Sequence, residues 1–230
     1  MVLTARQERM LRKLVDVFLD ENSRINLSAH RTSESCWTGN ILDSLAFLDV
    51  LSPGPNPEFR IPSDSLLDLG TGGGFPALPL AICLPGMTVT AMDATRKKVD
   101  AVRRIADRLA LPNLRTLVGR AEDIGRMPQH RARYDIVTSR AVAALSTLLE
   151  FCVPLARVGG CVVLWKSMDI DEELRTSANA QKQLHCSLVQ THRYDLGGNW
   201  GTRQLLVFRK DKATPAAYPR RTGLPGKDPL

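Results

Sequence analysis

The feature that most constrains the fold is a glycine-rich segment between two apolar stretches. It reads Asp68-Leu69-Gly70-Thr71-Gly72-Gly73-Gly74-Phe75-Pro76. The run before it, Leu66–Leu69, predicts a buried strand, and the stretch Leu78–Ile82 after it predicts a helix. A tight turn from strand to helix needs positions without a Cβ, where a ligand can also approach the backbone closely. The free amides and the dipole at the start of the helix then favour a carboxylate or a phosphate.

The spacing of the glycines narrows the class of ligand. The dinucleotide pattern G-x-G-x-x-G does not match when it starts at Gly70, because Phe75 occupies the third glycine position. When it starts at Gly72, it matches only if Ala77 replaces the third glycine. The pattern D-x-G-x-G-x-G fits fully, with Asp68 followed by Gly70, Gly72 and Gly74. It resembles the first motif of the class I S-adenosylmethionine (SAM) methyltransferases. No Walker lysine follows, which excludes a P-loop NTPase.

A carboxylate is expected beside this loop. Asp93 lies 19 residues after Gly74, at the end of the next predicted strand. A carboxylate in that place accepts hydrogen bonds from both ribose hydroxyls of a nucleoside cofactor. The alternative is that Asp93 only caps the following predicted helix, Arg96–Leu109.

The alternation of strands and helices predicts an α/β fold. Apolar runs predict seven strands, at residues 66–69, 88–92, 114–118, 136–139, 161–165, 187–194 and 203–208. The first five alternate with helical stretches, which implies parallel strands covered by helices. The last two flank Gly197-Gly198-Asn199-Trp200-Gly201 and predict an antiparallel hairpin. We therefore expect a mostly parallel, Rossmann-like seven-stranded sheet of the class I SAM-dependent methyltransferase type.

Four segments are predicted along the chain. Residues 1–51 form an N-terminal helical extension, whose first helix begins at a capping box of Thr4 and Gln7. Residues 52–63 are rich in proline and form a linker. Residues 64–210 form the SAM-binding domain. Residues 211–230 contain four prolines without periodicity, and we expect a flexible basic tail.

Composition limits the partners. The 230 residues carry 31 Lys and Arg against 24 Asp and Glu, a net charge of +7 that suits a polyanion such as nucleic acid. The five cysteines and four histidines show no metal-ligand spacing, so we expect no metal site and no disulfide framework. No apolar run is long enough for a membrane span and no signal peptide is evident, so we expect a cytoplasmic protein without a membrane partner.

Further short motifs resemble the bacterial RsmG family, also called GidB. They are Ile25–Ala29, Ile41–Leu45, the glycine loop with its helix, Ser139–Ala143, and Gly159-Gly160. Their order and spacing cover about residues 25–166. The chain departs from the family pattern at Thr38-Gly39-Asn40, where Arg-His is frequent, at Ala77 in place of glycine, and at Ser167 after Lys166.

The resemblance implies SAM-dependent methylation of N7 of one guanine in 16S rRNA, at the position usually numbered 527. It also implies SAM contacts at Gly70, Phe75, Ala121, Glu122 and Arg140. Arg140 could instead form a surface ion pair, and Glu122 could merely cap a turn. We expect RNA contacts at Arg96, Lys97 and Lys166.

The expected partner is 16S rRNA or the small ribosomal subunit, and the expected state is a monomer. The N7 atom of guanine carries a lone pair in the neutral base, so its methylation requires no general base. The chain accordingly shows no nucleophile or acid–base constellation, and we name no catalytic residue. The alternatives are a SAM methyltransferase acting on another substrate, a nicotinamide-dependent oxidoreductase, and a non-catalytic rRNA-binding assembly protein.

Overall fold

The predicted α/β fold is confirmed by a computed structural model, which describes residues 3–51, 64–140 and 143–230. The described residues form one seven-stranded sheet with the order β3-β2-β1-β4-β5-β7-β6. The first five strands are parallel, and β7 is antiparallel to both β5 and β6. The predicted linker 52–63 lies outside the described residues.

The strands occupy the predicted runs, with β5 extended at its start. They are β1 Ser65–Leu69, β2 Thr88–Asp93, β3 Leu114–Val118, β4 Tyr134–Ser139, β5 Ala156–Lys166, β6 Cys186–Asp195 and β7 Thr202–Lys210. The helices are α1 Ala5–Arg24, α2 Ser33–Cys36, a π-helix η1 Trp37–Leu42, α3 Asp43–Leu45, α4 Phe47–Leu51, α5 Ala77–Cys83, α6 Arg96–Arg108, α7 Ala121–Ile124, α8 Leu145–Cys152, α9 Asp171–Thr176, α10 Ala178–Leu184, the 3-10 turn η2 Gly198–Trp200 and α11 Leu224–Lys227.

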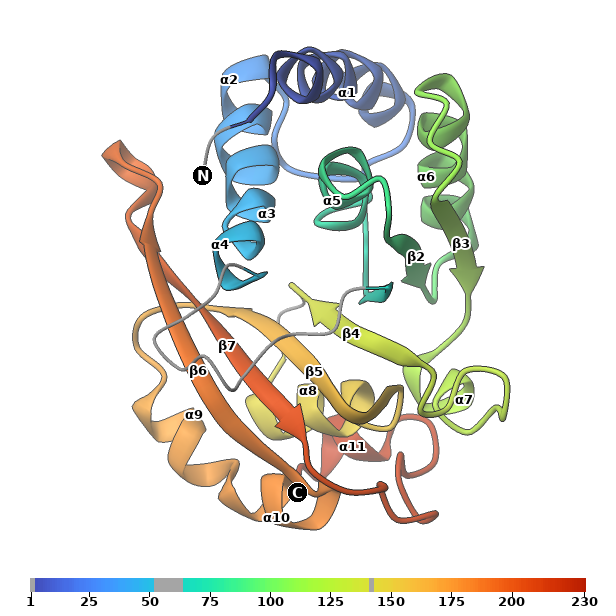
Figure 1. Ribbon diagram of the computed structural model, residues 1–230, viewed down its shortest axis with the longest axis vertical. Coiled ribbons are helices and arrows are strands. Elements are labelled where there is room, and N and C mark those ends of the chain that lie inside the picture. The colour runs from blue at the N-terminus through green and yellow to red at the C-terminus, as the bar shows by residue number, and fades with distance from the viewer. Residues whose placement is uncertain (1–2, 52–63, 141–142) are drawn as a thin grey trace.

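Helices cover both faces of the sheet. Figure 1 shows α1 to α6 above the sheet and α8 to α11 below it. Because successive side chains of a strand point to opposite faces, alternate strand residues enter two separate cores. Leu66 of β1 packs with the N-terminal helices, α5 and α6, whereas Leu67 packs with α7, α8 and α10. Among the described residues, no helix combines the length and the apolar character that a bilayer crossing requires.

The N-terminal helices share the core of the sheet. The capping box of Thr4 and Gln7 begins α1 as predicted, since each side chain bonds the backbone of the other residue. An apolar stripe of α1 that includes Leu14 and Phe18 is buried against the layer of α5 and α6. A buried Glu21 also accepts hydrogen bonds from Arg104 of α6, the shortest at 2.8 Å.

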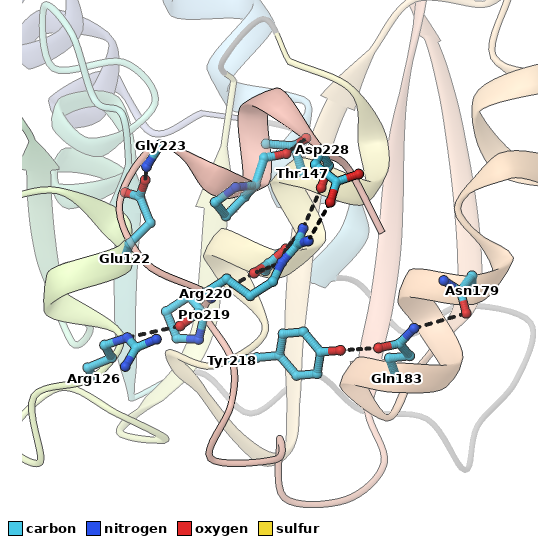
Figure 2. A network of polar contacts seen from close by, with 12 residues as sticks. Glu122, Arg126, Thr147, Asn179, Gln183, Tyr218, Pro219, Arg220, Gly223 and Asp228 are labelled. Atoms are coloured by element: carbon cyan, nitrogen blue, oxygen red, sulfur yellow. Dashed lines mark hydrogen bonds and ion pairs between the residues drawn. The ribbon is translucent and has the colours of Figure 1, made fainter.

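The prediction of a flexible tail after Lys210 is wrong. Residues 211–230 return across α7 and α8, as Figure 2 shows. The guanidinium of Arg131 donates to the backbone carbonyls of Thr214, Pro215 and Tyr218 at 2.9, 3.1 and 2.7 Å. The proline-rich composition was misleading because the contacts are made largely through backbone oxygens, which leave no sequence pattern.

A buried ion pair fixes the same segment further on. Arg220 donates to both carboxylate oxygens of Glu150, which is fully buried in α8, with a shortest distance of 2.7 Å. The amide of Gly223 donates to Glu122 at 2.9 Å (Figure 2). Removing either partner of a buried ion pair leaves an uncompensated charge, so this segment is part of the folded core.

Candidate functional site

The glycine loop leaves an open space at the carboxyl edge of the sheet. It connects β1 to α5, and the amides of Gly70 and Thr71 both donate to the carbonyl of Met92 in β2 at 2.9 Å. Gly72 has a φ of +55°, and a Cβ built there meets only one atom within 4 Å, the Gly70 carbonyl oxygen at 3.9 Å. A ligand can therefore lie directly against this backbone.

Gly74 serves the packing of the loop rather than its opening. Its φ is +97°, and a Cβ there would lie 2.4 Å from the Leu78 side chain and 3.3 Å from that of Val102. The glycine thus allows α5 to approach α6 closely. The three predicted glycines therefore meet at one loop, with Gly72 facing the opening.

Asp93 lies beside the opening. Its Oδ2 atom accepts a hydrogen bond from the amide of Gly72 at 3.1 Å, and its Oδ1 atom accepts one from the amide of Thr95 at 2.8 Å. The carboxylate therefore both supports the turn before α6, as the alternative interpretation expected, and borders the glycine loop. Arg96 and Lys97 follow as exposed side chains in the first turn of α6.

Asp68 stabilises the glycine loop from its buried side. It is fully buried, and it accepts hydrogen bonds from the Thr138 hydroxyl at 3.0 Å and from the Ala77 amide at 3.3 Å. Burial raises the pKa of Asp68 to about 6, although these hydrogen bonds act in the opposite direction. Its ionised form is therefore disfavoured by folding, and stability is lost as pH rises towards 6.

We expect Asp68→Asn to remove this pH dependence. A carboxyl whose pKa is raised on folding contributes stability below its unfolded value of 3.8, and that stability is lost as pH rises through about 6. The free energy of unfolding of the variant, relative to the wild type, should therefore increase by about 2–3 kcal/mol between pH 4 and pH 7. Urea titrations across this range measure the difference. Asp64→Asn, which changes an exposed carboxylate, is the control. If the free energy of unfolding of Asp68→Asn varied with pH in parallel with that of the wild type, the raised pKa of Asp68 would be contradicted.

Arg140 follows β4 and is part of a buried charge network. Its guanidinium donates to the carboxylate of Asp43 at 2.8 Å, to the Gly39 carbonyl at 3.0 Å and to the Asn40 side chain at 3.2 Å. Asp43 is fully buried and also pairs with Arg203 at 3.2 Å. The alternative interpretation expected a surface ion pair for Arg140, whereas the structure pairs it with a fully buried carboxylate. Arg140 nevertheless stays near the loop, 5.9 Å from the centre of the Phe75 ring.

A cavity of about 730 Å³ adjoins Arg140 at the ends of β4 and β5 and the start of β7. We call it the Trp200 pocket. Its charged and aromatic lining residues are Arg140, Trp165, Lys166, Glu173, Trp200 and Arg203. No group of three or more potential metal ligands occurs among the described residues.

Sequence comparisons identify the family. Residues 7–199 match the sequence profile described as GidB, rRNA small subunit methyltransferase G. The chain belongs to this family. It is 36% identical over 229 residues to ribosomal RNA small subunit methyltransferase G of Desulforamulus reducens, covering 99% of this chain and 92% of that protein. It is 40% identical over 227 residues to the protein of the same name from Deinococcus radiodurans, covering 98% and 87%.

Structural comparison supports the same fold class. An O-methyltransferase from Bacillus cereus, solved in complex with SAH, superposes with a TM-score of 0.59 at 19% identity and covers 85% of this chain and 90% of that one. TYW2 from M. jannaschii, solved in complex with AdoMet, gives 0.52 at 13% identity, with 64% and 69% covered. At these identities the likeness shows the class I methyltransferase fold alone.

Three residues predicted as ligand contacts have partners within the protein. Glu122 is buried and its carboxylate binds the Gly223 amide, so it holds the C-terminal segment. Lys166 donates to the Ala143 carbonyl at 2.8 Å and to Glu173 at 2.6 Å, and its side chain is only 9% exposed. The Phe75 ring is buried against Phe18, with ring centres 4.8 Å apart. Lys166 was predicted to contact RNA, and in the structure its amine is held by the Ala143 carbonyl and Glu173 within the protein while its side chain lines the Trp200 pocket.

The departure from the GidB pattern at Gly39 has a structural counterpart. A Cβ at Gly39 would lie 2.6 Å from both the His30 ring and the Trp200 ring. These two rings pack together, with centres 5.2 Å apart. The space that a side chain at position 39 would need is thus filled by Trp200 from the tip of the β6–β7 hairpin.

Sequence reasoning missed several charged residues that the fold holds in internal hydrogen bonds and ion pairs. They are Asp43, Arg131, Glu150, Glu173 and Arg203. A weak signal existed for Asp43 and Glu150, because each is a single carboxylate within an otherwise apolar helical stretch. Such a residue on a buried face requires a partner, although its sequence does not say which one.

Proposed function

We propose that this chain transfers the methyl group of S-adenosylmethionine to N7 of one guanine in the 16S rRNA of the small ribosomal subunit, at the position usually numbered 527. The observation that carries the proposal is the open glycine loop with Asp93 hydrogen-bonded to Gly72, in a chain of the GidB family.

The residues at the loop fit this cofactor. The backbone at Gly72 faces the opening without a side chain, and the Asp93 carboxylate beside it suits the two ribose hydroxyls. Ala121, at the start of α7 after β3, then borders the adenine. Arg140 lies on the side of the loop opposite to Asp93, where its guanidinium packs near the Phe75 ring and helps to position the loop.

The chemistry needs alignment more than proton transfer. Bound SAM supplies an electrophilic methyl group on a positively charged sulfur. The N7 lone pair forms the new N–C bond while the S–C electron pair returns to sulfur, so the positive charge moves to the purine and no proton leaves. The protein therefore has to hold the base in line and exclude water, which lowers the barrier without a general base.

Mapping N7-methylguanine in rRNA from cells with and without this gene tests the activity. We expect one methylated guanine to be lost without the gene and restored by the protein. Unchanged methylation would contradict the proposal. Binding of SAM without methyl transfer to any RNA or subunit would favour the assembly-protein alternative instead.

Gly72→Asp should abolish SAM binding. The substitution places a side chain in the open space and a second carboxylate beside Asp93, at a φ of +55° that disfavours residues other than glycine. Calorimetry should show at least a hundredfold loss of affinity, about 2.7 kcal/mol. Gly86→Asp is the matched control, since a Cβ there meets nothing within 4 Å and lies away from the loop. Wild-type affinity in Gly72→Asp would refute the loop as the binding site.

A further inference from the structure

The Trp200 pocket lies at the same edge of the sheet as the glycine loop, next to Arg140. In the sheet order β3-β2-β1-β4-β5-β7, the glycine loop follows β1 and Asp93 ends β2. A nucleoside whose ribose binds Asp93 and whose adenine borders Ala121, on the β3 side, would direct the part of the cofactor that carries the methyl group the other way, across β1 towards the end of β4. Arg140 stands at that side of the loop and also lines the pocket.

The charges of the pocket suit a nucleotide. Arg140, Arg203 and Lys166 are basic, and the two carboxylates that pair with them are Asp43 and Glu173. One positive charge is thus in excess. The Arg203 side chain remains 36% exposed while it pairs with Asp43, so it can contact a phosphate as well.

Glu173 presents a carboxylate to the pocket. Lys166 binds its Oε2 atom at 2.6 Å, and the amide of Leu145 donates to the same oxygen at 3.1 Å. The side chain is still 38% exposed at the pocket. A carboxylate held in this way is an acceptor of hydrogen bonds only, and it can take several of them.

We infer that the Trp200 pocket receives the target guanine, with Glu173 accepting hydrogen bonds from the N1–H and N2 amine and Trp200 stacking on the base. This inference rests on the proposed function and identifies the residues that determine which base is methylated. Enzymes that act on an extruded base read its Watson–Crick edge and stack it on aromatic side chains. Adenine presents a lone pair at N1, which a carboxylate repels.

The same carboxylate favours the reaction. As the methyl group reaches N7, positive charge develops on the purine and its N1–H becomes a stronger donor. The bond to Glu173 is then stronger in the transition state than in the ground state, which is the condition for catalysis by binding. Glu173 therefore acts on both selection and rate.

The test combines a protein variant with a base analogue. Small subunits are assembled with 16S rRNA that carries either guanine or inosine, which lacks the N2 amine, at the target position. The wild type should methylate inosine with a kcat/KM at least tenfold lower, as expected for a lost hydrogen bond to a charged group. In Glu173→Gln the kcat/KM for guanine should fall about tenfold or more, and the guanine/inosine ratio should approach one.

Matched variants distinguish a loss of base recognition from a loss of folding. Glu172→Gln changes the neighbouring carboxylate of α9, which is 70% exposed and pairs with Arg175, and should leave both values unchanged. Trp200→Ala should lower kcat/KM while Trp200→Phe retains most of it, which keeps the test valid if Glu173→Gln is unstable. The affinity for SAM should stay at the wild-type value in every variant.

Two results would overturn the inference and leave the proposed function intact. One is a wild type that methylates inosine as well as guanine. The other is a Glu173→Gln variant with the wild-type guanine/inosine ratio. A wild type that methylates neither subunit would instead refute the proposed function itself.

Discussion

Truncation of the chain after Lys212 is expected to destabilise the protein severely. It removes Arg220, which leaves the fully buried Glu150 carboxylate without its cation, and it removes three of the carbonyls that Arg131 binds. An uncompensated buried charge alone costs about 3–5 kcal/mol. For a chain of this size, such a loss lowers the melting temperature by roughly 10 °C or more.

A pair of neighbouring substitutions isolates the cause. Arg220→Ala should reproduce most of the loss, whereas Arg221→Ala, which removes an exposed neighbouring arginine, should change the free energy of unfolding by less than about 0.5 kcal/mol. Urea unfolding and thermal scans of the three variants measure these differences. A truncated protein that melts at the wild-type temperature would show that the segment contributes nothing to the fold.

The second large effect is expected for Asp43→Ala. This carboxylate has no exposed surface, and it binds Arg140 at 2.8 Å, Arg203 at 3.2 Å and the Tyr194 hydroxyl at 2.6 Å. It thereby connects the N-terminal helices to the ends of β4, β6 and β7. Its removal leaves two partly buried arginines without a counter-charge, and we expect a loss of about 3–5 kcal/mol in the free energy of unfolding.

Equilibrium urea unfolding measures this loss. Asp16→Ala, which removes an exposed carboxylate on α1, is the control and should remain close to the wild type. Asp43→Asn should recover part of the loss, because an amide keeps an acceptor for Arg140 but carries no charge. A stability within about 0.5 kcal/mol of the wild type for Asp43→Ala would mean that water replaces the network at little cost.

The parts of the fold that could be predicted depend on neighbouring residues in the sequence. The apolar runs predicted the strands, because buried parallel strands are apolar throughout. The glycine loop was identifiable because its conformation excludes side chains, and the capping box because Thr4 and Gln7 bond each other within one turn. Each of these signals lies within a few positions of the chain.

The parts that could not be predicted depend on distant partners. Arg140 was expected at a ligand, and it binds Asp43, which lies in a helix from the other end of the chain. The carbonyls that hold Arg131 belong to residues with no common side-chain property, so composition suggested disorder. Glu122 has the expected position after β3, and only the three-dimensional course of the C-terminal segment shows that its carboxylate is already engaged.

The contact between Gly39, His30 and Trp200 has a consequence for how this sequence can change. A mutation that restores a large residue at position 39 would collide with the indole, and loss of the indole alone would leave a void beside the imidazole. Either substitution alone is expected to disturb this packing, whereas the two together are expected to be compatible. Relatives of this protein should therefore show correlated substitutions at these two sites, with a bulky residue at one accompanied by a small one at the other.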